Sequence, residues 1–144
     1  MGKKVSQSLG VCLILLLAVG AAWAETREFL IVTGEWSWKA KAGEAPVRDR
    51  GRGDVREIER YTFAPSFLVV KKGDTVVLRI HTLKGASHLV AVTAFGVPGV
   101  KISRGEEKTI RFVADKAGVF EIVCDTHKSP ETEGPMVAYL HVLD

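Results

Sequence analysis

Four residues in the second half of the chain have side chains that could bind a metal ion. Cys124-Asp-Thr-His127 places a thiol close before an imidazole, eight residues separate His127 from Met136, and His88 comes from an earlier segment. Taken singly, each has an ordinary explanation as a core or surface residue. Together they form a soft ligand set of one thiolate, two imidazoles and a thioether, which suits copper, while zinc would fit the first three almost as well.

The alternation of apolar residues predicts that these donors point toward a common interior. Cys124 has the same parity as the apolar residues two and four positions before it, so its sulfur should point inward at a strand end. His127 should lie in the following loop, and Met136 has the parity of the apolar residues of the last strand. With His88 at the start of another strand, the set matches the trigonal His, His, Cys arrangement with a distant axial Met that carries electrons in copper proteins.

The other two histidines fit this set less well. His81 has the opposite parity to the apolar face of its strand, and His141 the opposite parity to Met136, so both are interpreted as structural. Trp36 and Trp38 share one side of a strand, which indicates core or interface packing rather than a ligand platform.

Short strands must position these residues, because no long segment has helical periodicity. The alternating pattern predicts strands at residues 27–38, 58–63, 67–70, 75–82, 88–92, 108–113, 119–124 and 137–143. Strands at this spacing indicate an all-β fold, an antiparallel sandwich or barrel.

The stretch 39–56 interrupts this rhythm with six basic residues, three acidic residues and several small ones, and is predicted to be a loop insertion. Two interpretations stay open: a solvated, mobile connection, or a docking or oligomer-contact loop with a basic face.

The first 24 residues have the pattern of an export signal. Lys3 and Lys4 precede an apolar run that ends in Ala22-Trp-Ala24, a small-x-small cleavage pattern, so cleavage is expected before Glu25. The alternative is an uncleaved anchor, but the run is shorter than the roughly 20 residues that a spanning helix needs. Cys12 precedes the apolar run rather than following it, which argues against acylation.

Removal of this leader leaves residues 25–144 as one domain and changes the composition. The full chain has 20 Lys and Arg, 17 Asp and Glu and a formal net charge of +3; loss of two lysines leaves a net charge of +1. Nucleic-acid binding therefore loses its compositional support. Cys124 becomes the single cysteine, too few for a disulfide framework, in a chain expected to be periplasmic or secreted without a membrane span.

Several sequence segments, spread over most of the processed chain, resemble the cupredoxin family. They are Phe63-Ala-Pro-Ser-Phe-Leu-Val-Val-Lys-Lys-Gly-Asp, Gly85-Ala-Ser-His88, Ala94-Phe-Gly-Val97, Phe112-Val-Ala-Asp-Lys-Ala-Gly118 and Phe120-Glu-Ile-Val-Cys-Asp-Thr-His127. Within that family the chain looks most like nitrosocyanin and the copper domains of nitrous oxide reductase and cytochrome oxidase subunit II. The resemblance implies a Greek-key β-sandwich with one copper ion at one end, loaded in the periplasm.

Differences from the residues of these relatives limit the kind of copper site that we expect. Binuclear copper domains have a second Cys where this chain has Lys128, which excludes a two-copper centre. Nitrosocyanin has a Glu at the position of His88 and a further His in the loop after the Cys-x2-His, which is absent here. The gap between His127 and Met136 is longer than in ordinary blue-copper proteins, so Glu131, Glu133 or a water are alternatives to Met136 as axial ligand.

The expected function is that of a mononuclear copper protein that carries single electrons, without an enzymatic reaction, to a redox partner such as a cytochrome or an oxidase. The alternatives are a nitrosocyanin-like redox or ligand-binding protein with an open coordination position, and a copper carrier that delivers metal to an oxidase. A homo-oligomer is possible. A nucleophilic enzyme using Cys124 and His127 is disfavoured, since the sequence shows no third orienting group.

Overall fold

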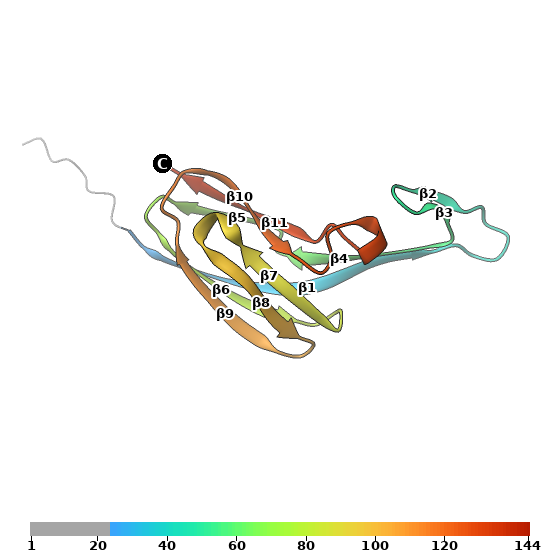
Figure 1. Ribbon diagram of the computed structural model, residues 1–144, viewed down its shortest axis with the longest axis horizontal. Coiled ribbons are helices and arrows are strands. Elements are labelled where there is room, and N and C mark those ends of the chain that lie inside the picture. The colour runs from blue at the N-terminus through green and yellow to red at the C-terminus, as the bar shows by residue number, and fades with distance from the viewer. Residues whose placement is uncertain (1–23) are drawn as a thin grey trace, which may run out of the picture.

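Alternating apolar residues give the chain a succession of β-strands, which the computed structural model describes over residues 24–144 (Figure 1). Residues 1–23, with nearly all of the predicted leader, lie outside the described residues. The elements are β1 (Thr26–Lys39), β2 (Val47–Asp49), β3 (Gly53–Val55), β4 (Glu57–Ala64), β5 (Phe67–Lys71), β6 (Thr75–Thr82), β7 (Ser87–Val92), η1 (Thr93–Phe95), β8 (Val97–Ser103), β9 (Glu107–Val113), β10 (Gly118–Cys124), η2 (Pro130–Thr132) and β11 (Val137–Leu143).

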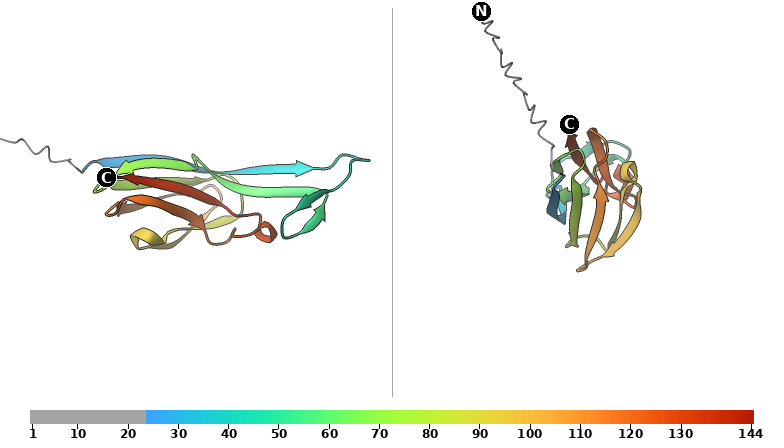
Figure 2. Two further views of the ribbon diagram at one scale, coloured as in Figure 1. Left: turned by 90° about the horizontal axis from the view of Figure 1, so that it is seen from above. Right: turned by 90° about the vertical axis from the view of Figure 1, so that its left-hand side faces the viewer.

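Two sheets face each other across one core. One has the strand order β4-β1-β6-β9 and the other β5-β11-β10-β7-β8. Figure 2 shows the strands from two further directions. On β6 the predicted inward face is confirmed, because Val76, Leu78 and Ile80 are fully buried. Inward residues of the second sheet, among them Ile122 and Leu140, close the core from the other side. The predicted all-β sandwich is confirmed.

Most strand pairs of this sandwich are antiparallel, as predicted, but two are parallel. β1 lies parallel to β6, and β5 lies parallel to β11. In both cases the paired strands are far apart in the chain, so a long connection can bring them side by side in the same direction. Residue alternation reports which face is buried and carries no information on strand direction.

The stretch 39–56 also differs from the predicted loop. β1 continues to Lys39 and pairs with β4 as a two-stranded ribbon that runs beyond the sandwich, and the β2–β3 hairpin lies at its end (Figure 1). Asp49, which is nearly buried, holds this hairpin by accepting hydrogen bonds from Arg60 of β4 and from Arg52. An ion-paired hairpin therefore replaces the expected irregular connection.

The two tryptophans of β1 lie on this ribbon. The buried positions of β1 are Ile31 and Thr33, so Trp36 and Trp38 have the opposite parity and face away from the core. Trp36 is 53% exposed, which excludes core packing, and Trp38 is half-buried. Interface packing stays a prediction.

The sequence pattern did not predict strand β8. It contains Pro98 and Gly99, which are typical of turns. Because β8 is an edge strand of the five-stranded sheet, the missing N–H of Pro98 can face away from the ladder.

The core position of Leu78 gives a test of this packing. Leu78→Ala should lower the free energy of unfolding by about 2–5 kcal/mol, because the cavity forms between two sheets that cannot collapse onto it. Val113→Ala is the matched control, since Val113 is 51% exposed on neighbouring β9, and it should change stability by less than about 0.5 kcal/mol. Urea denaturation measures both; equal losses would contradict the assigned core.

Candidate metal centre

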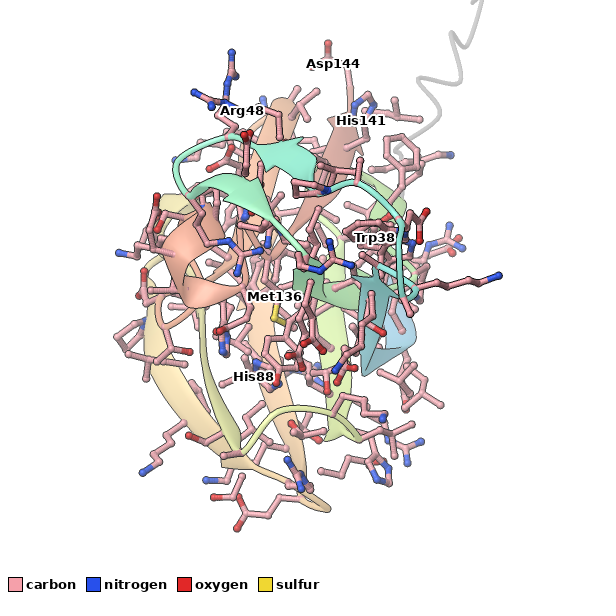
Figure 3. All side chains as sticks on the ribbon, turned by 90° about the vertical axis from the view of Figure 1, so that its right-hand side faces the viewer. Trp38, Arg48, His88, Met136, His141 and Asp144 are labelled. Atoms are coloured by element: carbon pink, nitrogen blue, oxygen red, sulfur yellow. The ribbon has the colours of Figure 1, made fainter. Side chains whose placement is uncertain are left out.

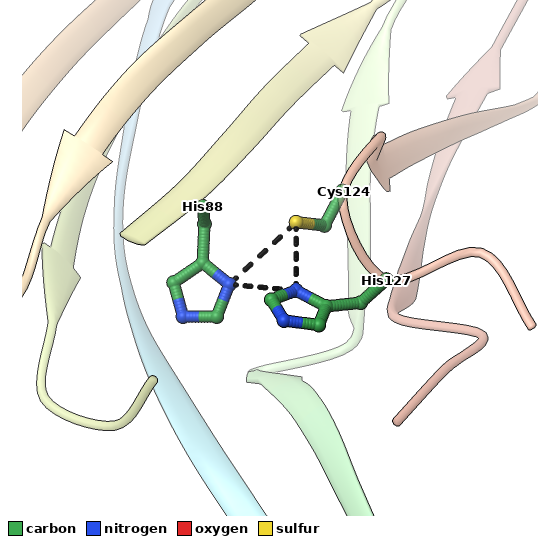
Figure 4. Close-up of side chains that lie close together, drawn as sticks. All are labelled: His88, Cys124 and His127. Atoms are coloured by element: carbon green, nitrogen blue, oxygen red, sulfur yellow. Dashed lines mark hydrogen bonds between the residues drawn. The ribbon is translucent and has the colours of Figure 1, made fainter. Parts of the chain in front are cut away.

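Backbone pairing at one end of the five-stranded sheet brings three of the predicted residues together (Figure 4). His88 is the second residue of β7, Cys124 is the last of β10, and His127 lies in the loop that follows. Cys124 pairs with Val90 of β7, which places the thiol beside the start of that strand. Met136 directly precedes β11.

The three donor atoms form a nearly equilateral triangle. Cys124 Sγ lies 3.3 Å from His127 Nδ1 and 3.5 Å from His88 Nδ1, and the two Nδ1 atoms lie 3.3 Å apart. A point equidistant from all three is about 1.9 Å from each, close to the metal–nitrogen distances of about 2.0–2.1 Å and the metal–sulfur distance of about 2.3 Å in zinc sites. The space between them therefore has the size of one metal ion.

The imidazole of His88 is already turned for this role. Its Nε2–H donates to the carbonyl oxygen of Lys84 at 2.7 Å, which leaves Nδ1 to face the thiol. Gly85 has a φ of +80°, and a Cβ on it would lie 2.7 Å from His88 Nε2. Only a residue without a side chain leaves room for the ring in this position.

The thiol of Cys124 is acidified by its surroundings. Burial raises its pKa, but hydrogen bonds with His88, Thr126 and His127 outweigh burial and lower the pKa from 9.0 to about 6. For His88, burial lowers the pKa, and contacts with Cys124 and the Lys84 carbonyl outweigh it and raise the pKa. The two shifts describe one thiolate–imidazolium pair, in which a metal ion would replace the Nδ1 proton.

Two residues that contact this centre were not predicted from the sequence. Thr126 Oγ1 lies 3.1 Å from Cys124 Sγ and 3.2 Å from His127 Nδ1. Tyr61 of β4 covers both imidazoles, with ring centroids 4.6 Å from His127 and 5.5 Å from His88. Thr126 stands inside the Cys-x2-His motif and could have been noticed; Tyr61 shares only the inward parity of buried Phe63.

The axial ligand is less well defined than the three converging donors. Met136 is buried, and its backbone joins the ligands, since Cys124 N–H donates to its carbonyl at 3.0 Å and its N–H donates to the His127 carbonyl at 2.8 Å. Figure 3 shows Met136 and His88 within this end of the molecule, with Arg48 pointing outward. Met136 as the axial ligand stays a prediction.

The carboxylates considered as alternatives are not part of the cluster. Among residues 24–144, the metal-binding side chains that converge here are His88, Cys124 and His127, without an Asp or Glu. Glu131 is exposed and faces the hairpin at Gly51, while Glu133 contributes its backbone carbonyl to the N–H of Tyr61 at 2.9 Å.

The two remaining histidines lie elsewhere, as predicted. His81 Nδ1 is 3.9 Å from a carboxylate oxygen of Glu107, and the ring of His141 packs on Phe67 with centroids 4.7 Å apart. Neither belongs to the converging cluster.

Sequence comparison identifies the family. A sequence profile of the cupredoxin-like domain matches residues 13–138, which is most of the chain. The chain belongs to the cupredoxin-like family. Among curated proteins no relative matches it significantly. The finer resemblance to nitrosocyanin, nitrous oxide reductase and cytochrome oxidase subunit II stays a prediction.

Solved structures share the fold of this cupredoxin-like domain. A copper-containing nitrite reductase from Thermus scotoductus SA-01 aligns with a TM-score of 0.58 at 22% identity, over 83% of this chain and 28% of its own. A copper nitrite reductase and a blue copper oxidase, both from Nitrosomonas europaea, align with TM-scores of 0.59 at 19% identity over 82% of this chain. The domain spans 41% and 39% of those two chains, so it corresponds to a part of each.

The described part of this cupredoxin-like domain, residues 24–144, includes no helix with the length and apolar character needed to cross a membrane.

The acidified thiol gives a pH prediction for the metal-free protein. Thiolate absorbance in the ultraviolet should titrate with a midpoint near pH 6, and Thr126→Val should move that midpoint toward 9.0 by removing one hydrogen bond to the sulfur. Because the folded-state pKa is depressed, the thiolate stabilises the fold above the unfolded pKa near 9, and this contribution is lost as the pH falls through about 6. A midpoint near 9 in the wild type would contradict the described contacts.

Proposed function

We propose that this protein is an exported, periplasmic mononuclear copper protein that carries single electrons. The observation that carries the proposal is the convergence of Cys124 Sγ with the Nδ1 atoms of His88 and His127 at 3.3–3.5 Å. Thiolate and imidazole are the donors that copper prefers, and the family and its structural neighbours support copper over zinc. One such cluster within residues 24–144 supports one ion per chain.

Bound copper would supply a one-electron Cu(I)/Cu(II) couple. The chain's contribution is a donor geometry that stays fixed between the two charge states, because Cys124 ends a sheet strand and His88 is held by the Lys84 carbonyl. The hydroxyl of Thr126 has the thiolate as its available acceptor once His127 Nδ1 is occupied, so it stabilises negative charge on the sulfur.

Burial adds an electrostatic preference. His88 and Cys124 are almost inaccessible, and the cluster holds a single acidic group, the thiol. Two neutral imidazoles and one thiolate would balance the single positive charge of Cu(I). An apolar interior would therefore disfavour Cu(II), which leaves one positive charge unbalanced. We expect this donor set to favour the reduced form relative to a site with a carboxylate ligand.

Electrons would leave through the side of the ligand loop. His127 is half-buried, in contrast to the other two donors, and a cavity of about 420 Å³ opens beside Cys124, His127 and Met136. Lys128 and Tyr139 are among the residues that line it, which gives a mixed polar and apolar surface for a partner such as a cytochrome or an oxidase.

Copper titration of the domain beginning at Glu25 tests the proposal. We expect one equivalent of Cu(II) to produce an intense thiolate-to-copper band and an EPR signal that both cycle reversibly with a one-electron reductant. Cys124→Ser should remove the band, because the hydroxyl is a poor donor to copper. Thr93→Val, on the exposed turn after β7, is the control and should leave the spectrum unchanged. Tight copper binding with the same spectrum in Cys124→Ser would refute the assignment.

The axial position is tested with Met136→Ala. If the thioether is the axial donor, the variant should keep the thiolate band, change its energy, and acquire a spectral response to azide or nitric oxide that the wild type lacks. A wild-type site that already responds to these ligands would support the open, nitrosocyanin-like alternative. Loss of copper from the wild type to a weak chelator within seconds would support delivery of the metal instead.

A further inference from the structure

A buried carboxylate holds the beginning of the described chain at the end of the sandwich opposite the metal centre. Asp74, in the turn between β5 and β6, is 1% exposed. Its Oδ1 accepts the backbone N–H of Glu25 at 2.9 Å, and its Oδ2 accepts the backbone N–H of Lys71 at 3.0 Å. An ionised carboxylate at such a position requires hydrogen bonds and an opposite charge close by.

Within the described chain, the cation next to Asp74 is Arg27, which is shared with a second carboxylate. Arg27 reaches Asp74 Oδ2 with its Nε at 3.4 Å, yet its side chain is 42% exposed and forms a closer ion pair with the carboxylate of Glu25 at 2.7 Å. Among residues 24–144, Asp74 Oδ1 is therefore contacted by the neutral amide of Glu25, while the cation Arg27 reaches the other oxygen, Oδ2. The nitrogen of that amide belongs to the residue that follows Ala22-Trp-Ala24 in the sequence.

We propose that Asp74 is a receptor for the amino terminus of the processed protein. Hydrolysis of the Ala24–Glu25 bond by a signal peptidase adds one water molecule across the amide: Ala24 leaves as a carboxylate, and the Glu25 nitrogen becomes an ammonium group. The same nitrogen that donates to Asp74 at 2.9 Å then carries a positive charge. Processing thereby converts a neutral hydrogen bond into an ion pair; this inference rests on the proposed export with cleavage before Glu25 and does not depend on copper binding.

The surrounding backbone fixes which residue can provide this charge. The carbonyl of Glu25 accepts the N–H of Thr75 at 2.8 Å, and Thr26 then begins β1 in register with Thr75. A chain cut one residue earlier would keep an uncharged amide at Asp74, and a chain cut one residue later would lack this nitrogen. Of these three starting points, a chain that begins at Glu25 is the one that would put an ammonium nitrogen at Asp74 Oδ1.

Electrostatics gives the pair a defined pH window. The N–H of Glu25 is the largest cause that lowers the pKa of Asp74, followed by the N–H of Lys71, against the raising effect of burial. An ammonium beside this carboxylate has its pKa raised above its ordinary value of about 7.7–8.0. The carboxylate contributes stability that is lost as the pH falls through its lowered pKa, and the ammonium contributes stability that is lost as the pH rises through its raised pKa.

Other charged groups at this end of the molecule are included in that expectation. They are Glu25 just before β1, Arg27 in β1, Lys71 at the end of β5, Lys72 in the turn that follows, Asp115 after β9, and Asp144 after β11. All of them are common to the processed and the blocked chain, so a comparison between the two isolates the amino group.

The test compares three purified forms: the chain that begins at Glu25, the same chain with an acetylated amino group, and a chain with Ala24 retained. We expect the free Glu25 form to have an unfolding equilibrium constant at least about tenfold smaller than the other two near pH 6, where the amine is charged. The advantage should shrink near pH 10, where the amine loses its proton. Urea denaturation measures each form.

Asp74→Asn supplies the decisive comparison, because it should abolish the difference between free and acetylated chains. Asp115→Asn, an exposed acid at the same end, is the matched control and should preserve that difference. If Asp74→Asn does not fold, the comparison of free and acetylated chains with Asp74 intact still decides. Equal stability of those two forms would overturn the proposal, as would mass spectrometry of the exported protein showing a first residue other than Glu25.

Discussion

Three backbone hydrogen bonds, where β10 ends and β11 begins, fix the relative positions of three residues of the candidate metal centre. Cys124 N–H donates to Met136, Met136 N–H donates to His127, and His127 N–H donates to Cys124. These bonds form a closed set, so the positions of the three residues relative to one another follow from the sheet rather than from a bound ion. The remaining donor, His88, is added by the pairing of β10 with β7. A change in the backbone positions of these residues therefore requires opening of the sheet where β10 lies between β11 and β7.

The same arrangement explains why the thiol is both buried and acidic. Burial alone would keep Cys124 protonated and inert, whereas the convergence of two imidazoles and a hydroxyl on the sulfur reverses that tendency. The structure thus keeps a charged group inside an apolar core by surrounding it with donors. Tyr61 and Gly85 contribute by shape, the first by covering both rings and the second by leaving space for one of them.

Residue alternation predicted the centre to the extent that strand parity controls it. It was correct for the inward direction of Cys124 and Met136, because Cys124 ends β10 and Met136 directly precedes β11, so both keep the alternation of a regular strand. It could not find the Lys84 carbonyl or Tyr61, since these contacts depend on a turn conformation and on the packing of one sheet against the other. The parallel strand pairs and the β2–β3 hairpin were missed for a similar reason: pairing direction and ion-pair closure leave no trace in local periodicity.

The two ends of the described chain lie together. β1 begins beside the Gly73–Asp74 turn, and the last residues of β11 bond the same turn through the N–H of Lys72 and the carbonyl of Leu143 (Figure 2). The donors occupy the opposite end of the sandwich. A second domain, or a tether to a surface, could thus be joined after β11 without approaching the ligands. The converging side chains of His88, Cys124 and His127 would then face away from whatever is attached there.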